Sequence, residues 1–124
     1  MIISIDARSS VPIYQQLKTA LIAGILSGQI KEGERLASVR DLGSDLGINL
    51  HTVRKVYGIL ADEGYIELTR NQGAVVGKPP KLDKEGMAQF EKVLLPIVIE
   101  LRARDIDKEQ YHQMMDRLWD ESIG

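Results

Sequence analysis

The strongest pattern of hydrophobic and polar positions lies between residues 36 and 60, which form two short blocks with helical spacing. Ser38 occupies the N-cap position of the first block, and Asp41 follows three residues later, as in a capping box. Gly47 ends this block, because glycine readily adopts the left-handed conformation of a helix C-terminus. The first block is therefore predicted to be a short helix, with an apolar face made of Val39, Leu42 and Leu46.

The second block begins after Asn49, a residue that is favoured at helix N-caps. Its apolar positions have the i, i+3, i+4, i+7 spacing of one buried helix face, and they are Val53, Val56, Tyr57 and Leu60. The opposite face carries His51, Lys55 and Gly58. Two helices joined by so short a turn favour a helix-turn-helix, and two helices of an ordinary helical domain are the alternative.

A helix that is held by one apolar face can present the polar side chains at its N-terminal end to the DNA major groove. The N-terminus of the preceding helix favours an anion such as a phosphate. We therefore expect DNA contacts from both helices. The candidates are Ser38 and Arg40 in the first helix and Leu50, His51, Thr52, Arg54 and Lys55 in the second.

Two strand-like runs, residues 65–69 and 74–76, flank a polar turn and predict a β-hairpin. Asn71 and Gly73 both tolerate the positive φ that we expect at its tip. Two helices followed by a hairpin make a winged helix-turn-helix. The tip adds further candidates for DNA contact, namely Arg70, Asn71, Gln72 and Gly73.

Three segments of the chain carry a family resemblance: PIYQQLKTALIAGILSGQIKEGERL, LASVRDLGSDLGIN and HTVRKVYGILADEGYIE. Together with the wing they cover about residues 11 to 78, and they resemble the GntR family of bacterial transcription regulators, in particular its YtrA-type branch. The resemblance implies a DNA-binding repressor in which Arg40 and Arg54 match positions that contact DNA. Many members carry arginine just before the threonine pair of this helix, where this chain has Leu50 and His51.

The N-terminal part of the chain predicts one more helix, which starts near Ser10 and Pro12 and ends at Gly28. Its apolar residues recur every four positions, at Ile13, Leu17, Leu21 and Ile25. Residues 2–5 form either a short strand or a clip over the core. Residues 29–36 contain a turn at Gly33, and in the resembling family such a segment adds a strand to the wing sheet.

Residues 77–80, with the sequence GKPP, mark a boundary, because paired prolines exclude both a helix and a central strand. We therefore expect a winged helix-turn-helix domain over residues 1–78 and a helical dimerisation region over residues 79–124. The predicted fold class is mostly α with a small β-hairpin.

The helical region begins with apolar residues at alternating steps of three and four, like those of a coiled coil. An isolated helix needs a partner for such a stripe, and a second copy of the chain is the simplest one. Pro96 interrupts the pattern, so we expect a kink there or a break into two helices. The last segment starts with Asp107 as N-cap, Gln110 as its capping-box partner, and a staple between Ile106 and Tyr111.

The expected dimer interface combines residues of both segments: Met87, Phe90, Leu94, Ile97, Leu101, Met115, Leu118 and Trp119. A ligand pocket lined by methionine and tryptophan is the alternative for the last segment. The 44 residues after Pro80 are too few to enclose a large ligand except across a dimer. An effector of unknown identity therefore remains among the expected partners.

The net charge of −2 is low for a protein that binds nucleic acid, but the charge is unevenly divided. Residues 1–78 hold nine Lys or Arg against eight Asp or Glu, and residues 79–124 hold seven against ten. Binding should therefore depend on where the basic residues lie. Those in or beside the contact elements are Arg35, Arg40, Arg54, Lys55 and Arg70.

The sequence offers little material for an enzyme. His51 and His112 are the only histidines, cysteine is absent, and no cluster has metal-ligand spacing, so neither a metal nor a cofactor is expected. No signal peptide and no apolar run of about 18 residues is found, which predicts a cytoplasmic protein without a membrane partner.

The sequence predicts a homodimeric regulator that binds double-stranded DNA at an inverted repeat. The alternative is a winged-helix module for protein interaction or scaffolding. The exposed face of the second helix argues against that alternative, because it offers no apolar hot spot.

Overall fold

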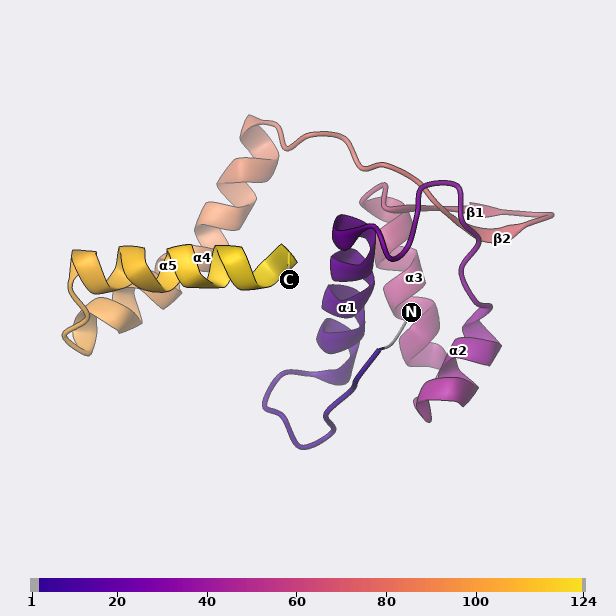
Figure 1. Ribbon diagram of the computed structural model, residues 1–124, viewed down its shortest axis with the longest axis horizontal. Coiled ribbons are helices and arrows are strands. Elements are labelled where there is room, and N and C mark those ends of the chain that lie inside the picture. Colours follow the sequence, from indigo (N-terminus) through magenta and orange to yellow (C-terminus); the bar gives the residue numbers. More distant parts are fainter. Residues whose placement is uncertain (1–2, 124) are drawn as a thin grey trace. The chain divides into compact units, whose positions relative to one another are not determined.

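The computed structural model describes residues 3–123 and contains five helices and one two-stranded sheet (Figure 1). The elements follow the order α1 (Ile13–Ser27), α2 (Val39–Leu46), α3 (Leu50–Asp62), β1 (Ile66–Thr69), β2 (Gly73–Val76), α4 (Lys84–Ala103) and α5 (Lys108–Ile123). The chain divides into two compact units, Met1–Pro79 and Pro80–Gly124. The fold class of a winged helix-turn-helix with C-terminal helices is confirmed.

The core of the first unit is a single apolar cluster to which all three helices and the sheet contribute. Both α1 and α2 pack against α3, which places α3 at the centre of the unit. α1 ends as predicted at Gly28, whose φ of 83° is left-handed. The buried residues are Leu17, Leu21, Ile30, Leu36, Leu42, Val53, Val56, Tyr57, Leu60, Ile66, Ala74 and Val76.

The wing is an antiparallel hairpin that projects from the end of α3 away from the helices (Figure 1). Ile66 pairs with Val76 at its base, and Thr69 pairs with Gly73 at its tip. The segment before α2 joins this sheet, as the resemblance implied: Arg35 forms a bridge with Val75, and the Leu36 N–H donates to the Ala74 carbonyl at 2.8 Å.

The N-terminal segment, for which the sequence left open a short strand or a clip over the core, forms a clip. Residues 3–6 form no strand, and the half-buried side chains of Ile3 and Ile5 pack against the core. Gln16 of α1 ties this segment down, because its amide accepts from the Asp6 N–H at 2.8 Å and donates to the Asp6 carbonyl at 2.9 Å. Residue 2, which the prediction included, lies outside the described residues.

The second unit consists of α4 and α5. α4 runs unbroken through Pro96, so the expected break into two helices does not occur. The capping box at the start of α5 is confirmed: the Gln110 N–H donates to the Asp107 carboxylate at 2.8 Å, and the Asp107 N–H donates to the Gln110 side chain at 3.0 Å. None of the side chains of residues 80–122 is buried.

In the described part of the chain, no helix has the length and apolar character needed to cross a membrane.

Candidate nucleic-acid interface

The start of α2 has the geometry that the sequence predicted. Ser38 is the N-cap, and its hydroxyl oxygen accepts the Asp41 N–H at 3.0 Å. This bond uses one of the amide donors that a helix start leaves without a partner in the helix. Arg40 lies in the first turn with its side chain exposed. The helix end and the guanidinium together are suited to an anion such as a backbone phosphate.

The turn between α2 and α3 is tight because two glycines permit it. Gly47 adopts the left-handed conformation with φ 66°, which ends α2. A Cβ at Gly43 would lie 3.2 Å from the Ile48 carbonyl oxygen, so this turn passes close to the α2 backbone. Asn49 then caps α3, as predicted, by accepting the His51 N–H at 2.7 Å.

The predicted face of α3 is buried in the core, and the other side carries the candidate contacts. His51, Arg54 and Lys55 are exposed, whereas Leu50 and Thr52 are half-buried at the helix start. A Cβ at Gly58 would meet nothing within 4 Å, so the backbone is open at this position. The exposed side chains of α3 around His51 are thus polar, and the apolar Leu50 beside them is half-buried.

Lys55 makes a contact that the sequence analysis missed. Its ammonium nitrogen lies 4.1 Å from the centre of the Tyr14 ring in α1, a cation–π geometry. Lys55 thus reaches toward α1 as well as lying on the exposed side of α3. The two residues are far apart in the sequence, and no local pattern pairs them.

The candidate arginines are available to a polyanion. Within residues 3–122 the only ion pair joins Lys18 and Glu63 at 3.0 Å. The guanidiniums of Arg40, Arg54 and Arg70 therefore have no carboxylate partner in the described part of the chain. Their charge remains uncompensated at short range, as phosphate binding requires.

The tip of the wing is held by Thr69. Its hydroxyl donates to the Gly73 carbonyl and accepts the Gln72 N–H, both at 2.9 Å. Of the two residues predicted to tolerate a positive φ, Gly73 adopts one, at 68°, and Asn71 does not. The hairpin needs only one left-handed residue, and glycine takes that position. The side chains of Arg70, Asn71 and Gln72 are all exposed.

A groove of about 430 Å³ lies between the start of α2 and the wing. It brings Ser38 together with three candidates of the wing tip that are distant from it in sequence, Asn71, Gln72 and Gly73. Arg35 also lines the groove, because its bridge to Val75 places it beside the wing. Arg40, Arg70 and the exposed residues of α3 do not line it, so some candidates lie in the groove and others lie outside it.

The expected dimer residues of the second unit are largely uncovered. Phe90 is 57% exposed and Trp119 is 74% exposed, values that are high for aromatic side chains of a folded chain. Met87, Leu94, Ile97 and Leu118 are also exposed, and Leu101 and Met115 are half-buried.

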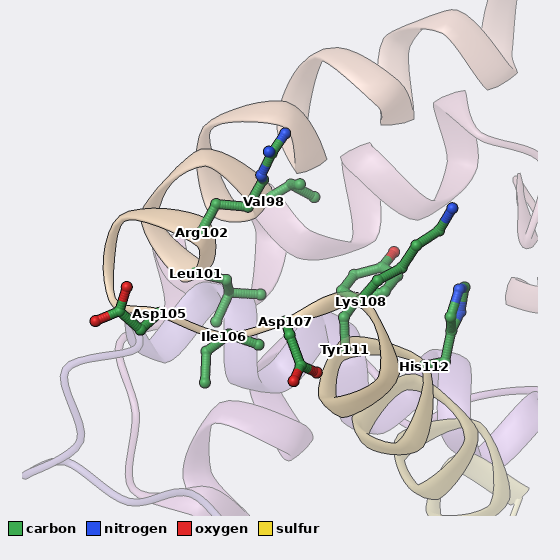
Figure 2. A pocket seen from close by; sticks show the side chains of 9 residues that line it. All are labelled: Val98, Leu101, Arg102, Asp105, Ile106, Asp107, Lys108, Tyr111 and His112. Atoms are coloured by element: carbon green, nitrogen blue, oxygen red, sulfur yellow. The ribbon is translucent and has the colours of Figure 1, made fainter.

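A cavity of about 720 Å³ lies at the elbow between α4 and α5 (Figure 2). Leu101, Ile106 and Tyr111 supply its half-buried apolar lining. Figure 2 shows Asp105 pointing away from the side chains of Lys108 and His112. The His112 ring stands edge-on to that of Tyr111, with centroids 5.4 Å apart. The elbow thus combines an apolar surface with nearby basic side chains.

Residues 13–76 match the family model described as bacterial regulatory proteins, gntR family. The match covers more than half of the chain. The chain belongs to the gntR family. This membership confirms the resemblance and the expectation of a regulator rather than an enzyme, because the family consists of regulatory proteins.

Relatives within the gntR family extend the similarity to the C-terminal helices. The chain is 32% identical over 118 residues to the HTH-type transcriptional repressor YtrA of Bacillus subtilis (strain 168), covering 94% of this chain and 91% of the repressor. The structure of YtrA from Sulfolobus acidocaldarius, a GntR-family transcription factor, is 33% identical with a TM-score of 0.57, covering 96% and 97% of the two chains.

A third protein matches over the whole length of the chain. The crystal structure of a transcriptional antiterminator from Listeria monocytogenes EGD-e matches with a TM-score of 0.91 and 25% identity, covering 100% of this chain and 94% of the other. Both units of this gntR-family chain therefore have counterparts in that structure.

Proposed function

We propose that this chain is a transcriptional repressor that binds an inverted-repeat operator as a homodimer in the cytoplasm. The observation that carries the proposal is the surface of α3. One face is locked into the core, and His51, Arg54 and Lys55 on the other are exposed. A helix held in this way is the element that enters the major groove in helix-turn-helix proteins.

The second part of the interface supports contact with the DNA backbone. The wing tip and the start of α2 flank one groove, and Arg40 and Arg70 carry charges without a carboxylate partner among the described residues. Phosphate contacts of this kind fix the register of a protein on duplex DNA, while contacts from the recognition helix read the bases.

The homodimer is supported by the exposed apolar surface of α4 and α5. Met87, Phe90, Leu94 and Ile97 are each about half exposed in the single chain. Contiguous apolar surface of this kind favours a protein partner. A second copy presents the same stripe, and a two-fold dimer would place two α3 helices on an inverted repeat.

We further propose the elbow cavity as the site of the unidentified effector. Its volume of about 720 Å³ lies within the range of small-molecule sites, about 300–1,000 Å³. A thermal-shift screen of small carboxylates against the protein and against Val98→Trp, which adds bulk at the cavity wall outside the expected dimer residues, would test this assignment. A ligand that stabilises both proteins equally binds elsewhere.

The central experiment is selection of bound sequences from a random duplex pool with the full chain. We expect enrichment of an inverted repeat, because a two-fold dimer reads two equal half-sites. Arg54→Ala serves as the control protein and should enrich a less specific pool. A pool without any enriched sequence, obtained with protein that remains dimeric in sedimentation, would favour the protein-interaction module instead.

A further inference from the structure

A part-buried hydrogen bond joins α3 to the segment that leads into α2. The Tyr57 hydroxyl donates to the Ala37 carbonyl oxygen at 2.6 Å. Tyr57 is only 3% exposed, and burial raises the pKa of its hydroxyl to about 12. The group therefore stays protonated and remains a donor at neutral pH.

The residue that receives this bond directly precedes the helix start. Ala37 is followed by the N-cap Ser38, and Arg40 lies two residues further on. Ala37 is itself exposed, so its methyl group gives the segment no anchor in the core. On its other side the segment is tied to the wing by the bond from the Leu36 N–H to Ala74. The Tyr57 hydroxyl thus fixes the residue that precedes the N-cap of α2.

The same tyrosine lies close to the proposed base-reading residue. Arg54 precedes Tyr57 by three positions on α3, a spacing that makes two side chains neighbours on a helix surface. The contact therefore joins α3, one turn beyond Arg54, to the segment that leads into α2 and Arg40. Binding sites of this kind must be held to within about 0.5 Å of their working geometry.

We propose that Tyr57 is a positioning residue for DNA binding, whose hydroxyl holds the start of α2, and with it Arg40, at a fixed position relative to α3. The proposal rests on the proposed DNA-binding function and adds a residue that does not itself touch DNA. Tyr57 then has two roles: its ring fills the core, and its hydroxyl aligns the two helices.

The test compares Tyr57→Phe with the unaltered protein on the selected operator. The ring stays in the core, and only the hydroxyl is lost. We expect the operator affinity to fall about three- to tenfold, which is the size of one net hydrogen bond. The matched control is Tyr65→Phe, because the Tyr65 ring also packs against the core and its hydroxyl has no hydrogen bond within the described residues. This control should bind as the unaltered protein does.

A double-mutant cycle with Arg40→Ala distinguishes positioning from a general structural role. If Tyr57 acts through Arg40, Tyr57→Phe should change affinity by less than about twofold once Arg40 is absent. Tyr57→Phe alone should also lower the salt dependence of binding toward that of Arg40→Ala. Equal losses in both backgrounds, or an unchanged affinity in Tyr57→Phe, would overturn the proposal.

A measurement without DNA distinguishes a failure of the positioning role from a failure of the proposed DNA-binding function. Amide hydrogen exchange at Asp41, whose N–H is held by Ser38, should be faster in Tyr57→Phe than in the unaltered protein, while exchange in the middle of α3 stays unchanged. Unchanged exchange at Asp41 contradicts the positioning role. Failure of the unaltered protein to bind any duplex, with the exchange difference present, contradicts only the DNA-binding function.

Discussion

The ammonium nitrogen of Lys55 lies 4.1 Å from the centre of the Tyr14 ring, so a residue on the exposed side of α3 contacts α1. We predict that Lys55→Met lowers the free energy of unfolding by about 0.5–1 kcal/mol, because it removes the cation and keeps a stem of similar length. Urea denaturation measures the change. Tyr14→Phe keeps the ring face and should have no effect. An unaltered midpoint in Lys55→Met would show that this contact carries no energy.

The two arginines of the helix-turn-helix should divide the work of binding. Arg54→Ala should lose the preference for one base pair in each half-site, worth about 1–3 kcal/mol, because a guanidinium can bind a guanine edge with two hydrogen bonds. Arg40→Ala should weaken all sequences alike and reduce the salt slope by about one unit per site. Titrations on the selected operator and its single-base variants, at several salt concentrations, check both outcomes. The reverse pattern would mean that α3 is rotated in the groove.

The wing tip depends on the left-handed conformation of Gly73, whose φ is 68°. Gly73→Val should lower the free energy of unfolding by about 1–2 kcal/mol, because a residue with a Cβ is strained at this φ. The variant should remain folded and bind DNA more weakly. Circular dichroism and operator titration measure the two effects. Gln72→Ala, in the same loop but without a positive φ, is the control for strain. A folded Gly73→Val protein with full affinity would place the wing away from DNA.

Truncation after Lys78 should give a folded monomer with weak and largely non-specific DNA affinity. The reason is that the apolar core lies entirely within residues 17–76, whereas the exposed apolar stripe lies in α4. Sedimentation and thermal unfolding of the fragment and the full chain test the two statements. A dimeric fragment would relocate the interface to the winged domain.

The raised pKa of Tyr57 predicts how stability depends on alkaline pH. The folded state holds the proton up to a pKa of about 12, whereas the ordinary value is 10.0. The contribution of the protonated Tyr57 hydroxyl to the free energy of unfolding is therefore fully present below pH 10, and it is lost as the pH rises toward 12. Urea denaturation at about pH 9 and about pH 11 should show a larger loss for the unaltered protein than for Tyr57→Phe. Equal losses would mean that Tyr57 titrates normally.

The features that could be predicted from the sequence are those set by neighbouring residues. The caps at Ser38, Asn49 and Asp107 need only a side chain and an amide two or three positions away. The left-handed ends at Gly28 and Gly47 follow from the absence of a Cβ. The burial of α3 followed from its spacing, because helix geometry alone brings the apolar positions to one face.

The features that could not be predicted depend on distant parts of the chain. The spacing of apolar residues placed Tyr57 in the core. The partner of its hydroxyl, Ala37, depends on how α2 packs against α3, which the sequence does not show. The contact of Lys55 with Tyr14 has the same origin. The sequence showed that Asn71 and Gly73 both tolerate a positive φ, but not that Gly73 alone adopts it.

No residue of α4 is buried in the single chain, so in the proposed assembly the second unit would gain its buried core from the second copy. Stabilisation of such a unit comes from its partner, so it depends on protein concentration. Each tenfold dilution would remove about 1.4 kcal/mol from the assembled state. A repressor built in this way responds to its own abundance: when its level falls, the C-terminal helices lose their order, the paired domains separate, and the operator is released.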